Sequence, residues 1–123
     1  MATLLVNAGK AIVTNRIKGS GTEPLNAAWG TGAGTTAAAD TTLFTEATPR
    51  AAGTSSQVTT SVTNDTYQVV ATITAGGALA ITNAGLFDVI TASSGNLFVK
   101  GDFTVINLST GDSIQFTFKT QFS

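Results

Sequence analysis

Histidine and cysteine are both absent from the 123 residues. Without His, the chain lacks the commonest general base of enzymes and the commonest side-chain ligand of metals. Without Cys, it can form neither a disulfide nor a thiolate metal site. Hydroxyl side chains are plentiful, but the chain has no imidazole to activate one and no S-x-x-K pair. These absences argue against an enzyme, and we expect no cofactor, no metal and no small-molecule substrate.

Charged residues are also scarce: they make up 11% of the chain, where soluble domains carry about 25%. The net charge of −1 provides no field to attract nucleic acid or an anionic membrane, so neither is an expected partner. No apolar run reaches the roughly 18 residues of a membrane-spanning helix. The start, MATLLVNAGKAIV, is a poor signal peptide because Lys10 interrupts it and no basic region precedes it. We therefore expect synthesis in the cytoplasm of the producing cell.

A surface so poor in charge has two explanations. Thr, Ser and Gly can make it polar without charge, or much of it can lie against other subunits. A free monomer with few charges and a net charge near zero tends to associate. Composition alone leaves both explanations open.

Threonine, present at 23 positions, is β-branched and favours strands. The segments expected to form strands are 25–29, 54–63, 66–75, 79–90, 97–108 and 113–122. A turn at Asn64–Asp65 joins the second and third, Gly85 is expected to mark a bulge, and 35–50 is expected to be a long connection with one helical turn near Leu43–Thr45. The rhythm of antiparallel hairpins without βαβ units predicts an all-β fold, an antiparallel sandwich or jelly roll. The residues expected in its core are Tyr67, Val69, Ile73, Leu86, Phe87, Phe103, Ile114, Phe116 and Phe118.

Residues 8–18 are expected to form a short helix, with Asn7 as N-cap and Gly19 as its C-terminal stop. The GSGTEP segment that follows would separate an N-terminal arm, residues 1–20, from a β-sandwich domain, residues 21–123. A helix of about eleven residues is marginal alone in water, so it must pack against its own sandwich or a neighbouring subunit. We expect the arm to fasten the protein to its partners, and to be removable without unfolding the sandwich. The candidate partner-binding residues are Leu4, Leu5, Lys10, Ile12, Arg16 and Lys18.

The glycine-rich segment WGTGAGTT, residues 29–36, has the spacing G-x-G-x-G rather than the G-x-G-x-x-G of dinucleotide loops. Thr35 stands where a P-loop has its Lys, so we interpret the segment as a loop between the arm and the sandwich. Glu46 and Arg50 are close enough to pair, and Arg in such a loop is more often a structural clamp than a substrate ligand. The carboxylates stand singly, which leaves a calcium site or a glycosidase pair open but selects neither. They are Glu23, Asp40, Glu46, Asp65, Asp88, Asp102 and Asp112.

Six segments together resemble small virion structural proteins of tailed bacteriophages, a group that includes capsid decoration (cement) proteins and tail or tail-fibre proteins. They are LLVNAGKAIVTNRIKGSGTEPLNAAWGTGAGTT, DTTLFTEATPR, TNDTYQVVATIT, ITNAGLFDV, GNLFVKGDF and NLSTGDSIQFTFK. The resemblance implies a non-enzymatic β-domain on the virion that clamps neighbouring subunits of the icosahedral shell. Its implied partners are the major capsid protein and further copies of itself, as a homotrimer.

Two other functions stay open at this point. The same domain would serve as a tail, tail-fibre or baseplate component, and no motif separates these from a shell protein. A carbohydrate-binding module would need exposed aromatic side chains, for which Trp29 and Tyr67 are the candidates outside the Phe-rich strands.

Overall fold

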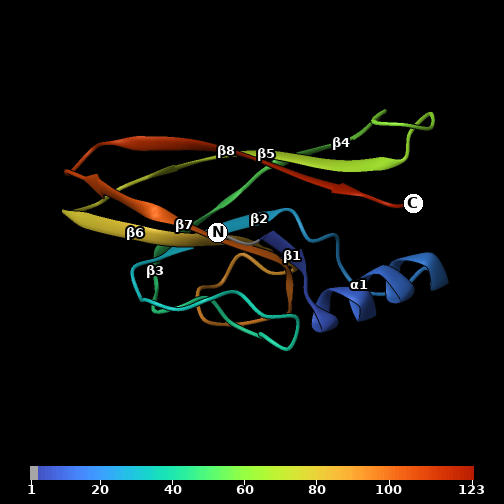
Figure 1. Cartoon of the computed structure of the whole chain (residues 1–123), viewed down its shortest axis with the longest axis horizontal. Coiled ribbons are helices and arrows are strands. Elements are labelled where there is room, and N and C mark those ends of the chain that lie inside the picture. The colour runs from blue at the N-terminus through green and yellow to red at the C-terminus, as the bar shows by residue number, and fades with distance from the viewer. Residues whose placement is uncertain (1–2) are drawn as a thin grey trace.

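The computed structural model describes residues 3–123 and shows two antiparallel β-sheets packed face to face, with one helix at one end (Figure 1). Sheet A contains, in spatial order, β1 (Thr3–Leu5), β7 (Leu97–Leu108), β6 (Leu79–Phe87), β2 (Asn26–Gly30) and β3 (Glu46–Ala52). Sheet B contains β4 (Thr54–Val58), β5 (Thr66–Thr74) and β8 (Ser113–Gln121), and the helix is α1 (Asn7–Lys18). The expected all-β sandwich with a short N-terminal helix is confirmed.

The chain changes sheet at three places instead of folding into hairpins throughout. β3 continues into β4 through Gly53, where a Cβ atom would lie 2.9 Å from the carbonyl oxygen of Val70. The links from β5 to β6 and from β7 to β8 also cross between the sheets, at the left-hand end of Figure 1. These two links are hydrogen-bonded to each other, because Ala75 donates to the carbonyl of Asp112 and Gly111 donates to the carbonyl of Ala75.

Four of the nine expected core residues are buried. Val69, Ile73 and Leu86 lie in the core between the sheets, whereas Phe87 belongs to a second buried cluster with Val6, Leu43 and Leu97. The other five are half-buried and pack against the core between the sheets; they are Tyr67, Phe103, Ile114, Phe116 and Phe118. Alternate residues of β5, including the expected core residues Tyr67, Val69 and Ile73, face the core between the sheets. Ile114, Phe116 and Phe118 lie on β8, which is an edge strand of sheet B and is therefore covered less completely than a central strand.

Strand β3 falls in a segment where the sequence predicted a connection. Pro49 lies within it, and proline in a run of residues argues against a strand because it cannot donate a ladder hydrogen bond. The structure accommodates Pro49 at the edge of sheet A, where the pairing of β2 with β3 is irregular between Ala27 and Trp29. The helical turn expected near Leu43–Thr45 is absent, and that stretch is a simple turn before β3.

Four further local expectations are wrong. The strand expected over 54–63 ends at Val58, and the strand expected over 79–90 ends at Phe87. The ladder between β6 and β7 is regular at Gly85 and irregular instead between Ile81 and Asn83 and after Leu86. In α1 the N-cap position is Val6, with no side-chain cap, whereas the C-terminal stop at Gly19 is confirmed by its φ of 90°.

The N-terminal segment contributes directly to the sandwich. β1 pairs with β7, with Thr3 opposite Gly101 and Leu5 opposite Val99. Val6 is fully buried, and its N–H donates to the carbonyl of Phe98. Residues 3–18 thus supply an edge strand and a helix to the folded body, and their removal would expose the part of β7 that they cover.

The loop between β4 and β5 is longer than the two-residue turn expected at Asn64–Asp65, although Asn64 does have a positive φ of 60°. The Asp65 carboxylate accepts N–H groups from Thr60, Ser61 and Val62 at 2.8 to 3.0 Å. These donors, Val62 and Thr60 foremost, hold the pKa of Asp65 far below its ordinary value of 3.8. One carboxylate therefore closes the loop over 60–65.

Phe116→Ala should remove a ring that packs edge-on against Trp29 at 6.5 Å and alongside Phe118 at 5.8 Å. Because the ring is half-buried, we expect a loss of about 2–3 kcal/mol of unfolding free energy, below the roughly 3–5 of a fully buried Phe. Urea unfolding followed by the fluorescence of the single tryptophan measures it. Thr117→Ala, on the outward face of β8, is the control and should stay within about 0.5 kcal/mol of wild type. An equally small effect of Phe116→Ala would contradict the packing described.

Asp65→Asn should lower stability at neutral pH and lose that effect in acid. The folded-state pKa of Asp65 lies below the unfolded value, so its contribution is present above about pH 4 and is lost as the pH falls through the lowered pKa. The urea midpoints of wild type and variant should therefore converge between pH 6 and pH 2. A gap that stays constant over this range would show that the loop does not depend on the ionised carboxylate.

Candidate interaction surface

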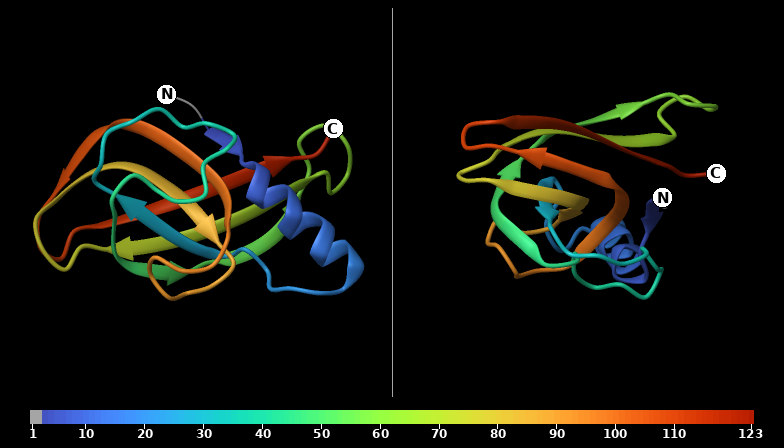
Figure 2. Two further views of the ribbon diagram at one scale, coloured as in Figure 1. Left: turned by 90° about the horizontal axis from the view of Figure 1, so that it is seen from below. Right: turned by 60° about the vertical axis from the view of Figure 1, so that its left-hand side comes forward.

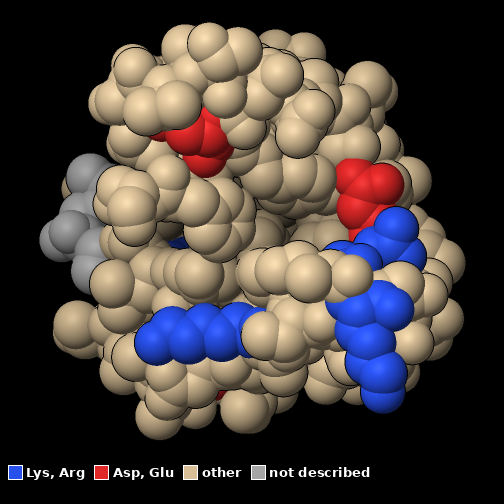
Figure 3. All heavy atoms as spheres, turned by 90° about the vertical axis from the view of Figure 1, so that its right-hand side faces the viewer, with Lys and Arg blue, Asp and Glu red and all other residues tan. Residues whose placement is uncertain are grey.

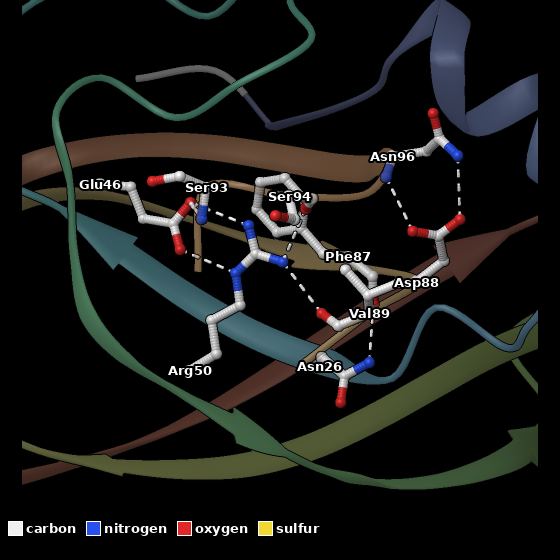
Figure 4. Close-up of polar contacts among 9 residues, drawn as sticks. All are labelled: Asn26, Glu46, Arg50, Phe87, Asp88, Val89, Ser93, Ser94 and Asn96. Atoms are coloured by element: carbon white, nitrogen blue, oxygen red, sulfur yellow. Dashed lines mark hydrogen bonds and ion pairs between the residues drawn. The ribbon is translucent and has the colours of Figure 1, made fainter. Parts of the chain in front are cut away.

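Arg50 in β3 is buried and fully engaged inside the protein. Its guanidinium forms a two-bond ion pair with Glu46, at 2.7 and 2.9 Å. It also donates to the carbonyls of Val89 and Ser94, both at 2.9 Å, and lies over the ring of Phe87 at 3.7 Å (Figure 4). Arg50 thus holds the loop after β6 against β3, which is the structural clamp expected from the sequence.

Lys100 in β7 is the second buried cation. Its ammonium group donates to Asp40 and to the carbonyl of Thr42, both at 2.9 Å, and lies over the ring of Phe44 at 3.3 Å. An N–H of Ala37 and the ammonium of Lys100 lower the pKa of Asp40. The ion pair fixes the loop between β2 and β3 over the outer face of sheet A, as the view from below shows (Figure 2, left).

The glycine-rich segment does not lie between arm and sandwich, as expected, but leads from β2 into the loop before β3. Trp29 and Gly30 are buried residues of β2. The N–H groups of Thr31 and Gly32 donate to the carbonyls of Thr45 and Phe44. A Cβ on Gly32 would lie 2.9 Å from the carbonyl carbon of Phe44, so the glycine allows the close approach of two backbone segments.

The two aromatic residues proposed for carbohydrate binding do not form an exposed platform. Trp29 is fully buried. Tyr67 is half-buried, and its hydroxyl donates to Glu23 at 2.9 Å. Burial and this bond raise the pKa of Tyr67. A carbohydrate-binding module built on Trp29 and Tyr67 is therefore contradicted.

Within residues 3–123, no three carboxylates come close enough together to hold a metal ion. Asp88, for example, accepts two hydrogen bonds from Asn96 and orders the loop after β6 (Figure 4). No helix in this described range is long and apolar enough to cross a membrane.

Helix α1 lies close against β7 because of Gly9. A Cβ at this position would collide with the carbonyl oxygen of Phe98. Ile12, one turn further along, is 5% exposed and belongs to the core. Leu5 packs against the same core from β1, and Leu4 is half-buried. Three of the six candidate partner-binding residues are thus occupied in part or in whole by internal packing.

The other three candidates, Lys10, Arg16 and Lys18, are exposed on α1. The chain has six Lys and Arg residues, of which Arg50 and Lys100 are buried and paired. Three of the four exposed cations therefore lie on one helix, which carries no acidic residue. Figure 3 views the end of the molecule where α1 lies: two separate groups of blue spheres lie mainly in its lower half, and a red group adjoins the right-hand one.

A groove of about 410 Å³ lies between α1 and the ends of the strands, and of the three cations Arg16 lines it. Tyr67 and Phe98 are among the residues that line it, and their rings meet edge to face at 5.8 Å. Two apolar side chains that also line the groove are exposed: Ile17 at 81% and Phe122 at 44%. Neither residue is among the partner-binding candidates predicted from the sequence.

A second, larger hollow of about 750 Å³ lies on the side where β8 and β1 are the sheet edges. Phe103, Phe116 and Phe118 line it, with Lys119 and Asp102 among the polar residues. The exposed cation there is Lys119 alone, so this hollow lacks the cluster of positive charge that borders the groove at α1.

A scan against protein-family models, a search of curated proteins and a search of solved structures each found no match to this chain.

Gly9→Ala tests whether α1 depends on its close approach to β7. Alanine is the better helix former by about 1 kcal/mol, so an unconstrained helix would gain stability. Because the added Cβ meets the carbonyl of Phe98, we expect instead a net loss of about 1–3 kcal/mol in urea unfolding. Asn15→Ala, exposed on the same helix, is the control and should be neutral or slightly stabilising. A Gly9→Ala protein at least as stable as wild type would mean that α1 is held in another way.

Proposed function

We propose that the protein is a capsid decoration (cement) protein of a tailed bacteriophage, bound to the outside of the icosahedral shell. The observation that carries the proposal is the end of the molecule at α1. There, exposed Ile17 and Phe122 border a groove, and the helix on one side of it carries three of the four exposed cations. A protein-binding surface has this character, with an apolar centre and a polar rim.

The interior supports a structural rather than a catalytic role. The buried ionisable side chains Arg50 and Lys100 are each fixed by an ion pair and by backbone carbonyls. The chain has no His or Cys to carry acid–base or nucleophilic chemistry. The sequence resemblance to small virion proteins of tailed phages supports the same conclusion.

Stabilisation of the shell follows from binding to its assembled form. A protein that binds assembled subunits but not separated ones stabilises the assembly by about 2.7 kcal/mol per site when its free concentration is 100 times Kd. Each copy would touch more than one capsid subunit, and the weak contacts would then reinforce one another. Association as a homotrimer would multiply them further, and the scarcity of surface charge favours such association.

The alternative is a tail, tail-fibre or baseplate component, and copy number separates the two. In purified particles of the phage that encodes the chain, we expect the protein in numbers comparable to the major capsid protein, because decoration sites repeat over the whole shell. Densitometry of stained gels, with the major capsid band as internal standard, measures the ratio. A band present in only a few per cent of that amount would assign the protein to the tail, and its absence from particles would refute both.

A further inference from the structure

The groove at α1 has a helical side and a strand side, and most of the side chains that line it are apolar. Tyr67 and Phe98 lie among its lining residues, and Ile17 forms part of the helical side. Phe122, directly after β8, lies across from the helix. At about 410 Å³ the groove is near the lower end of the range for ligand pockets, about 300–1,000 Å³. It is large enough for one or two apolar side chains of a partner but not for a folded element.

Positive charge outnumbers negative charge at this end of the molecule: α1 carries three cations, and one carboxylate lines the groove. Arg16 lines it, and Lys10 and Lys18 lie on the same helix. The carboxylate that lines it is Glu23, which already accepts the hydroxyl of Tyr67. Arg16 donates one N–H to the carbonyl of Gly21, which leaves the rest of its fork of donors for other acceptors. The excess of positive charge beside an apolar groove favours a partner that combines apolar side chains with carboxylates.

Nucleic acid fits this end less well than protein. Non-specific binding to nucleic acid depends on many cations along a backbone path, and single-strand binders add a series of stacked aromatic rings. The end at α1 offers three cations and one exposed aromatic residue, Phe122, on a chain of net charge −1.

We infer that the groove receives an acidic segment of the partner, which inserts an apolar side chain between Ile17 and Phe122. Carboxylates on either side of that side chain contact the cations of α1. The inference rests on the proposed function, since it takes the partner to be the shell protein, and it adds which face of this chain binds and what chemistry the shell must present there.

The test compares matched single substitutions at exposed positions in binding to undecorated shells of the same phage. Lys18→Glu should weaken binding by about tenfold or more, because it places a carboxylate opposite carboxylates. Lys119→Glu makes the same change of charge beside the larger hollow and should stay within about twofold of wild type. Ile17→Ser should also weaken binding, whereas Ile90→Ser, at an Ile 52% exposed in the loop after β6, should not. Sedimentation of shells with bound protein gives each affinity, and circular dichroism checks that each variant is folded.

The outcomes separate the inference from the function on which it rests. Failure of wild-type protein to bind shells would refute the proposed function itself. If Lys18→Glu and Ile17→Ser bind shells as tightly as wild type, the inference is overturned. If Lys119→Glu loses binding instead, the contact lies at the hollow beside β8. If wild-type protein binds single-stranded DNA and Lys18→Glu does not, the cations of α1 serve nucleic acid, and the inference is also overturned. Raised NaCl should weaken the binding of wild-type protein to shells, and it should weaken the residual binding of Lys18→Glu less. This difference in salt dependence would support the inference.

Discussion

The close contact between α1 and β7 determines what the rest of this molecule presents to its surroundings. Gly9 allows the helix to lie directly against the backbone of Phe98, and Ile12 then enters the core. With that face of the helix buried, the remaining faces point outward with their cations and with Ile17. The groove exists because the helix is held beside the strand ends instead of extending away as an arm.

The few charged side chains of this protein are distributed unevenly between its interior and its surface. Two of six cations and their carboxylate partners are used inside, where Arg50 and Lys100 fasten long loops to sheet A. Most of the exposed positive charge is left on one helix, while the sandwich faces are dominated by uncharged hydroxyl and amide side chains. A surface that is neutral in general and positive at one apolar end favours binding through that end.

The sequence predicted the fold class, the core residues of β5 and the pairing of Glu46 with Arg50, because each depends on local pattern or short separation. It did not predict β3, since Pro49 lies in a strand that only an irregular sheet edge tolerates. The burial of Trp29 and the exposure of Ile17 could not be predicted either, because both depend on which elements pack together over long separations. The groove itself joins residues from α1 to Phe122, and no spacing in the sequence indicates that they meet.

A density map of the intact phage particle, at a resolution that traces the chain, tests the proposed role most directly. We expect the protein on the outer surface of the shell, with α1 and Phe122 buried against capsid subunits and the crossovers between the sheets facing solvent. A map that places the protein in the tail, or on the shell with α1 exposed to solvent, would contradict this description of how the protein works.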